Sequence, residues 1–213
     1  MKSSNSPSST TFLQIPRWVV IIAGSGGSLS PLRVLVGSLT SSLDATYVCL
    51  VPFRINTLNH VADILEATAE LPVRPAENGD RLRRGQVLIA SSCDGPTARV
   101  EDAVLRFTPT ASSERDAHAS ALTVLFASAG KSFGSSAIGI GLSGPEDDGA
   151  IAARALKSAG GFLFVQSPQE AIHPRMPEAM RLEADLCAGT HELAARLHAI
   201  CQTRPVPVLK TGA

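Results

Sequence analysis

A serine lies inside a glycine cluster, where a hydroxyl group and backbone hydrogen-bond donors could meet. The sequence Gly24-Ser25-Gly26-Gly27 follows an apolar run and precedes a helical pattern. Glycine-rich turns can direct backbone N–H groups at a developing oxyanion. They can also hold a nucleotide phosphate, but the cluster lacks the Gly-x-Gly-x-x-Gly spacing, and no acidic residue ends the second apolar run. Nucleotide binding is therefore the weaker interpretation.

Ionisable groups that could assist such chemistry occur later in the chain. Glu146, Asp147 and Asp148 stand together after an apolar run, and His173 precedes a helical pattern. Like charges this close are expected to raise the pKa of some of these carboxyl groups. A carboxylate at this place could also simply begin the following helix. A histidine can act as a general base near neutral pH, although most loop histidines have no such role.

The elements that must position these residues alternate between buried strands and amphipathic helices. Continuous apolar, mostly β-branched or glycine-interrupted runs predict strands at residues 18–22, 47–51, 137–142 and 162–166. Apolar residues at helical spacing predict helices at residues 29–39, 58–69, 122–129, 150–158 and 192–201, with one more after Met176-Pro177. The alternation predicts an α/β fold, a doubly wound and mainly parallel sheet with helices on both faces.

The middle of the chain departs from this alternation. Short strand-like runs, separated by turns rich in glycine, asparagine and aspartate, fall at residues 73–76, 86–90, 98–100 and 104–107. They predict a small antiparallel β insertion. Residues 109–119 are polar and are expected to be irregular.

Ligands of a doubly wound sheet bind beyond the carboxyl ends of its strands. The predicted loops at that edge are residues 24–28, 52–56 and 143–149. The first contains the serine of the glycine cluster, and the last contains the three acidic residues. We therefore expect a site at this edge.

Composition limits the class of protein. The 213 residues are 44% hydrophobic, which suffices for one substantial core. We expect a disordered leader at residues 1–16, one domain at 17–203 and a C-terminal tail at 204–213. Lys+Arg and Asp+Glu both number 19, so no basic field favours nucleic acid or anionic lipid. No apolar run approaches the roughly 20 residues that cross a bilayer.

The cysteines carry no metal or disulfide signature. Cys49, Cys93, Cys187 and Cys201 show neither the close pairs of a zinc site nor the density of a secreted disulfide scaffold. The leader also lacks the basic and apolar regions of a secretory signal. These features predict a cytoplasmic protein with no cofactor, no metal, no nucleic-acid partner and no membrane insertion.

Several short motifs occur in unbroken order between about residues 18 and 200. They are Ser25-Gly26-Gly27, Ala76-Glu77-Asn78-Gly79-Asp80, Arg84-Gly85-Gln86-Val87-Leu88-Ile89-Ala90, Val124-Leu125-Phe126, Ser143-Gly144, Asp148-Gly149-Ala150, Ala159-Gly160-Gly161, Gln166 and Met176-Pro177. In order and spacing the series resembles the catalytic domain of the bacterial chemotaxis protein-glutamate methylesterases, the CheB type. The resemblance implies hydrolysis of glutamyl methyl esters on methyl-accepting chemoreceptors, without a cofactor.

The resemblance also implies a serine-histidine-aspartate triad, which this chain keeps only in part. The family's first loop resembles Gly-Ala-Ser-Thr-Gly-Gly, so the nucleophile position is Gly24 and Ser25 lies one residue late. The histidine position, at the end of the second strand, is Pro52, which has no ionisable group. The third loop keeps the aspartate at Asp148, while Glu146 replaces a glycine.

Two hypotheses follow for the site. In the first, hydrolysis is impaired: Ser25 is the candidate nucleophile, His173 or His60 the replacement base, and Asp148 lies behind the base. In the second, the protein is non-catalytic and binds a chemoreceptor or another chemosensory protein as a competitor, scaffold or sensor. Labelling of Ser25 by a serine-reactive phosphonate and release of methanol would separate them. The family usually carries an N-terminal receiver domain, and residues 1–16 are too short for one, so we expect a stand-alone domain or control by another chain.

Overall fold

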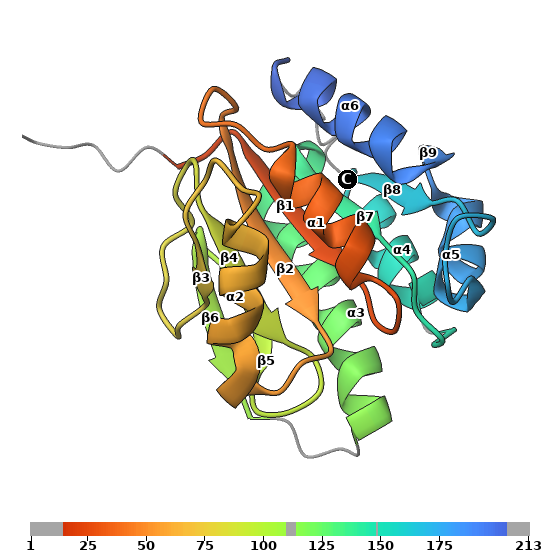
Figure 1. Cartoon of the computed structure of the whole chain (residues 1–213), viewed down its shortest axis with the longest axis horizontal. Coiled ribbons are helices and arrows are strands. Elements are labelled where there is room, and N and C mark those ends of the chain that lie inside the picture. Colours follow the sequence, from red (N-terminus) through yellow and green to blue (C-terminus); the bar gives the residue numbers. More distant parts are fainter. Residues whose placement is uncertain (1–14, 110–113, 148, 204–213) are drawn as a thin grey trace, which may run out of the picture.

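A seven-stranded sheet lies between two layers of helices in the computed structural model, which describes residues 15–109, 114–147 and 149–203 (Figure 1). The strand order is β3-β4-β2-β1-β7-β8-β9, and every neighbouring pair is parallel. The strands are β1 (Trp18–Ala23), β2 (Ala45–Val51), β3 (Val73–Pro75), β4 (Val87–Ser91), β7 (Ala137–Gly141), β8 (Phe162–Gln166) and β9 (Leu186–Ala188). The predicted fold class is confirmed.

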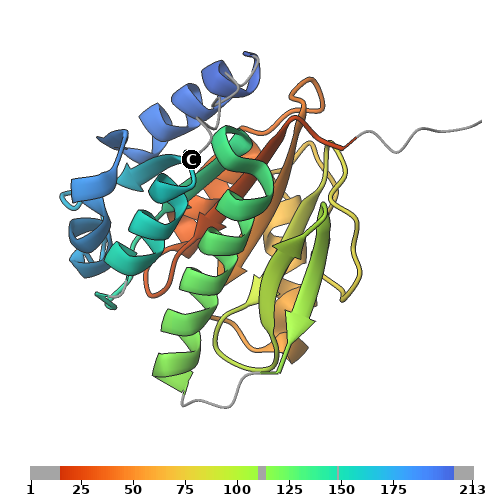
Figure 2. The same cartoon turned by 180° about the vertical axis from the view of Figure 1, so that it is seen from behind.

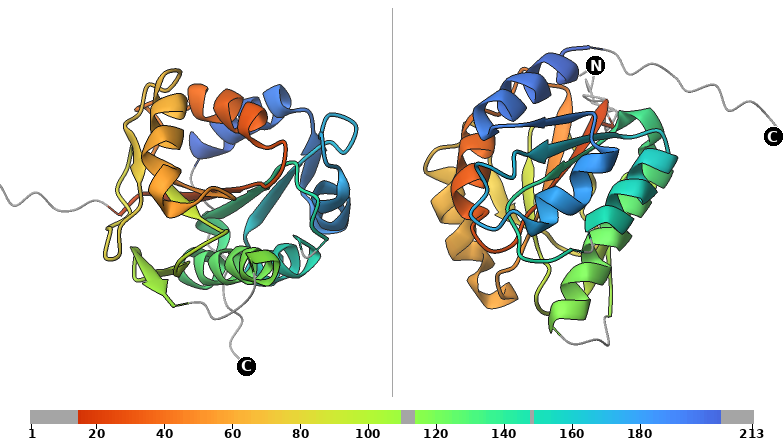
Figure 3. Two further views of the ribbon diagram at one scale, coloured as in Figure 1. Left: turned by 60° about the horizontal axis from the view of Figure 1, so that its bottom comes forward. Right: turned by 90° about the vertical axis from the view of Figure 1, so that its right-hand side faces the viewer.

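Helices cover both faces of the sheet (Figures 1 and 2). One face carries α1 (Leu29–Gly37), α2 (Leu58–Glu66) and α6 (Thr190–Cys201), and the other carries α3 (Glu114–Phe133), α4 (Gly149–Ser158) and α5 (Arg175–Met180). The two layers are separate in Figure 3. In the part of the chain that the structure describes, no helix is both long and apolar enough to span a membrane.

Alternate residues of each central strand enter two different cores. In β1, Val20 and Ile22 pack with α1, whereas Val19 and Ile21 pack with α3. All six residues of β1 are buried. A strand that is buried on both faces needs no polar alternation, which is why it reads as a continuous apolar run.

The predicted antiparallel insertion is smaller than expected. An antiparallel pair is formed by β5 (Thr97–Glu101) and β6 (Val104–Thr108), with one further antiparallel bridge between Arg81 and Val104. The runs at residues 73–76 and 86–90 instead form β3 and β4 of the parallel sheet. The prediction for those two runs was wrong. The connection from β3 to β4 is long enough for the chain to return to the end of the sheet at which β3 begins. The strand β4 can therefore run parallel to β3 and to β2.

Two other expectations are corrected. Within residues 109–119, which were expected to be irregular, α3 begins at Glu114. Its first turns lack the apolar periodicity that revealed the rest of the helix. The sequence also gave no signal for β9, a three-residue strand at the sheet edge that pairs with β8. So short a strand has too few residues to show a pattern.

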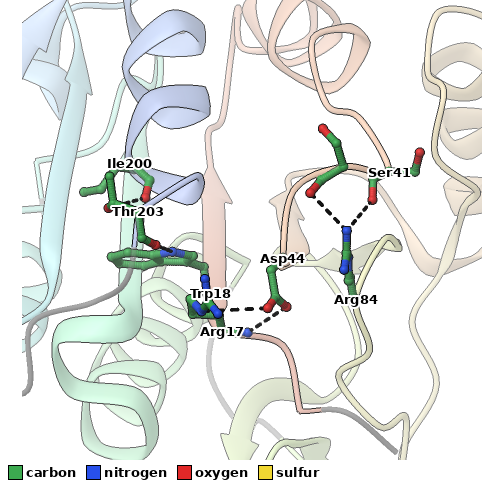
Figure 4. A network of polar contacts seen from close by, with 8 residues as sticks. Arg17, Trp18, Ser41, Asp44, Arg84, Ile200 and Thr203 are labelled. Carbon is green, nitrogen blue, oxygen red and sulfur yellow. Dashed lines mark hydrogen bonds and ion pairs between the residues drawn. The ribbon is translucent and has the colours of Figure 1, made fainter.

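A polar network closes the amino edge of the sheet, the edge at which the strands begin (Figure 4). The Arg17 backbone N–H donates to Asp44 Oδ1 over 3.1 Å, and the Trp18 indole donates to the Thr203 carbonyl over 3.2 Å. Arg84 donates to the Ser41 carbonyl over 2.9 Å. These bonds join β1, the end of α6 and the loop before β2, and they lie at the opposite end of the strands from the predicted site.

Candidate active site at the carboxyl edge of the sheet

The loops that follow β1, β2 and β7 meet because β1 pairs with both other strands. The Ser25 backbone N–H donates to the Ser143 carbonyl over 2.9 Å, which joins the first loop to the third. The Gly24 N–H donates to the Leu50 carbonyl over 3.2 Å, which ties the first loop to β2. The predicted site loops are therefore adjacent in space.

A cleft of about 510 Å³ opens at this edge. Ser25, Gly26 and Gly27 of the first loop line one part of it. The rest is largely apolar and includes Leu29, Pro52, Phe53, Ile64 and Ile172. The cleft thus combines a glycine-rich turn with apolar walls, as small-molecule and side-chain sites commonly do.

Ser25 lies at the wall of this cleft, with 8% of its surface exposed. Its hydroxyl donates a hydrogen bond to Glu146 Oε1 over 3.0 Å. Its carbonyl accepts two bonds from Ser28, one from the backbone N–H over 3.1 Å and one from the hydroxyl over 2.7 Å. These contacts fix the turn that carries the serine.

Gly24, the nucleophile position implied by the resemblance, has no room for a side chain in this backbone. A β-carbon built there would lie 2.3 Å from Ser28 Cβ and 2.7 Å from its hydroxyl oxygen. Non-bonded carbon atoms pack at about 3.5–4.0 Å, so a serine at this position would displace Ser28 or the start of α1.

Pro52, the implied histidine position, lines the cleft at the end of β2. It offers no proton acceptor on its side chain. His60, considered as a replacement, lies exposed on α2, with no hydrogen bond to Ser25. The structure thus brings Ser25 and Pro52 to one cleft, and His60 is not among the residues that line it.

His173 lies beside the first loop. A β-carbon built on Gly26 would be 3.0 Å from His173 Cδ2 and 3.3 Å from Nε2, so the imidazole rests against the glycine turn. The His173 backbone N–H donates to Ser143 Oγ over 2.9 Å, and Ser143 Oγ donates to the Gly26 carbonyl over 2.7 Å. The ring is close to the turn, but no hydrogen bond joins it to Ser25 in the described part of the chain.

Asp148, the implied aspartate of the triad, lies outside the described residues. Its neighbour Asp147 forms an exposed ion pair with Arg175 over 2.7 Å. Glu146 is the group that sequence reasoning did not connect to Ser25. Its replacement of a glycine in the third-loop motif was visible, but only the fold shows that its carboxylate reaches the serine hydroxyl.

A second set of polar contacts holds the loop that follows β7. The Ser143 N–H donates to Gln166 Oε1 over 2.9 Å, and Gln166 Nε2 donates to Glu170 Oε1 over 3.3 Å. Partial burial acts to raise the pKa of Glu170, but hydrogen bonds from Thr190 and Gln166 outweigh it and lower that pKa. Glu170 is therefore held as a carboxylate that orders the segment between β8 and α6.

The described residues offer no metal-binding group. No cluster of three or more His, Cys, Asp and Glu side chains in the described part of the chain could hold a metal ion. The polar side chains that line the cleft are those of Ser25, Ser30 and Arg33, and the Glu146 carboxylate is hydrogen-bonded to Ser25.

A parallel doubly wound sheet with a serine-bearing glycine turn at its carboxyl edge defines this chain as an α/β protein with a candidate site at that edge. The family model of the CheB methylesterases matches residues 20–197. The chain therefore belongs to the CheB methylesterase family, as the sequence motifs predicted.

Individual relatives agree with this assignment. The chain is 31% identical over 188 residues to protein-glutamate methylesterase/protein-glutamine glutaminase 5 of Myxococcus xanthus (strain DK1622), covering 84% of this chain and 51% of the relative. It is 30% identical over 195 residues to protein-glutamate methylesterase/protein-glutamine glutaminase 3 of Anaeromyxobacter dehalogenans (strain 2CP-C), covering 86% of this chain and 54% of the relative. The chain spans about half the length of these curated relatives.

A solved structure shares the fold. The crystal structure of the Thermotoga maritima CheB methylesterase catalytic domain superposes with a TM-score of 0.75 at 21% sequence identity, covering 86% of this chain and 98% of that chain. At this identity the match establishes the fold alone.

Proposed function

We propose that this chain acts in bacterial chemosensory signalling as a methylesterase-family domain that engages methyl-accepting chemoreceptors and whose ester hydrolysis is impaired. Family membership supports the receptor as the partner, because the relatives are protein-glutamate methylesterases. Impairment is supported by the cleft itself. The observation that carries it is the absence of space for a side chain at Gly24, where a β-carbon would lie 2.3 Å from Ser28 Cβ.

Two further features support impairment. Pro52 occupies the position where the family's histidine would accept the serine proton, and no described histidine is bonded to Ser25. Removal of a general base costs about 10²–10⁴-fold in rate in enzymes that use one. Backbone donors alone can still leave about 10³-fold catalysis over the reaction in water, so a slow residual reaction is compatible with the cleft.

Methanol release from methylated chemoreceptor fragments tests this proposal. We expect the purified chain to release methanol at least about 100-fold more slowly than an active catalytic domain of the family, because the histidine base is missing. Ser25→Ala should remove whatever release remains. Equal rates for this chain and the active domain would contradict impairment.

A non-catalytic role is the second candidate. The hydroxyl of Ser25 is already bonded to Glu146, and apolar residues form much of the cleft, so the site could bind a receptor segment without turning it over. Co-sedimentation with receptor fragments measures this directly. Binding by both the wild type and Ser25→Ala, with no methanol from either, would favour this role, whereas absence of binding would remove the receptor as the partner.

A further inference from the structure

The Glu146 carboxylate, which is hydrogen-bonded to the Ser25 hydroxyl, is in the position that a general base requires. A base must lie within hydrogen-bond reach, about 2.6–3.2 Å, of the hydroxyl that it deprotonates. Glu146 Oε1 accepts a hydrogen bond from the Ser25 hydroxyl over 3.0 Å, so the carboxylate lies within reach of the hydroxyl proton. In the described part of the chain, Glu146 is the ionisable side chain that hydrogen-bonds this serine.

The environment of the pair suits acyl chemistry. Ser25 lines the cleft together with Gly26 and Gly27. The backbone of these two glycines borders the cleft, which is where N–H donors to an oxyanion would have to lie. The Ser25 carbonyl is held by both donors of Ser28, which limits rotation of the turn. The nucleophile and the proton acceptor are thus held in place.

We propose that Ser25 and Glu146 form a serine-carboxylate dyad, in which Ser25 is the nucleophile and Glu146 is the general base of the residual ester hydrolysis. The identity of the natural substrate, a methylated chemoreceptor, rests on the proposed function. The dyad replaces both missing members of the family's arrangement from neighbouring positions. The serine has moved one residue along the first loop, and the base comes from the third loop rather than from the second.

The chemistry balances without a further reactant except water. Ser25 Oγ bonds to the ester carbonyl carbon while its proton passes to Glu146. The bond from that carbon to the methoxy oxygen then breaks, and Glu146 returns the proton to form methanol, leaving an acyl group on Ser25. Water gives a proton to Glu146 as it attacks the acyl carbon, and the proton returns to Ser25 Oγ as that oxygen leaves. The product is the free carboxylic acid.

The test uses p-nitrophenyl acetate and a methylated chemoreceptor fragment as probes, with the full chain as the enzyme. Glu146→Gln keeps the shape and a hydrogen-bonding oxygen but cannot accept the proton, and we expect kcat to fall about 100-fold with both probes. Asp147→Asn is the matched control, because it removes a neighbouring negative charge whose carboxylate pairs with Arg175 on the surface. That control should retain the wild-type rate.

Phosphonate labelling keeps the proposal testable if turnover is slow. A fluorophosphonate should label Ser25 in the wild type and in Asp147→Asn, and label it at least tenfold more slowly in Glu146→Gln. Unchanged labelling and turnover in Glu146→Gln, or a loss caused by His173→Ala instead, would overturn the dyad. Absence of both hydrolysis and labelling in every variant would also overturn the dyad. That result would still agree with impaired hydrolysis and would not affect the test of receptor binding.

Discussion

At the scale of single residues, positions 24 and 25 of the first loop have very different surroundings. The glycine at position 24 lies against Ser28, and the hydroxyl at position 25 reaches the third loop. A side chain at position 24, the nucleophile position implied by the resemblance, would overlap with Ser28 unless Ser28 moved. Restoring the motif by substitution alone should not restore a working turn.

Gly24→Ser is expected to destabilise the protein by about 1–3 kcal/mol, the usual cost of forcing extra atoms into a packed site. In a Ser28→Gly background the same substitution should cost less, because the β-carbon with which it overlaps is gone. Urea unfolding of the four proteins gives the coupling energy, which should be at least about 0.5 kcal/mol. Equal costs in both backgrounds would show that Ser28 does not limit this position.

At the scale of elements, glycines mark where helices approach the sheet most closely. A β-carbon built on Gly139 of β7 would lie 2.5 Å from Leu156 Cδ2 of α4 and 2.8 Å from Phe126 Cε2 of α3. The glycines that interrupt this otherwise apolar strand are thus explained by helix packing. A glycine in a strand interior commonly marks such a close approach.

Gly139→Ala should therefore lower the free energy of unfolding by about 1–3 kcal/mol through overpacking. A matched variant that combines it with Leu156→Ala tests the cause. If the alanine methyl group overlaps with Leu156, the double variant should be more stable than the sum of the two single effects predicts. Strict additivity in denaturant unfolding would place the cost elsewhere.

Much of the element order could be read from the sequence, and the exceptions have physical causes. The strands β1, β2, β7 and β8 are buried on both faces, so their sequences are apolar runs that predict strands. The direction of β3 and β4 could not be read, because parallel and antiparallel pairing use the same residue types.

The candidate site could be predicted from the sequence only in part, because its contacts join distant segments of the chain. The loops that form it could be predicted from the order of strands, and the serine could be placed on one of them. The bond between Ser25 and Glu146 joins residues 121 positions apart. Which side chains meet across two loops depends on tertiary packing, which no local pattern contains.

At the scale of the whole molecule, buried thiols link stability to alkaline pH. Burial raises the pKa of Cys49 to about 12, and burial together with the charge of Asp44 raises the pKa of Cys201 to about 12. Both cysteines are free and lie in the core shared by α1, α2 and α6. In the unfolded chain a thiol has a pKa of about 8.5.

The folded protein therefore holds these protons more tightly than the unfolded chain does. The resulting stabilisation is complete below pH ~8.5 and is lost as the pH rises toward ~12, by up to about 1.4 kcal/mol per pH unit for each thiol. Urea unfolding between pH 7 and 10.5 measures the decline. Replacing both cysteines with alanine should flatten the curve, although Tyr47, whose pKa burial also raises, leaves part of the slope. A curve unchanged by the double replacement would refute the assignment.

The hydroxyl of Ser143 has a mechanical consequence for the cleft. It donates to the Gly26 carbonyl and accepts the His173 N–H, so one rotation of this side chain would break both bonds together. Backbone bonds from the Ser25 N–H to the Ser143 carbonyl and from the Gly144 N–H to the His173 carbonyl would still join the loops. The exchange of the His173 amide hydrogen with solvent deuterium would report how often the Ser143 hydroxyl releases it.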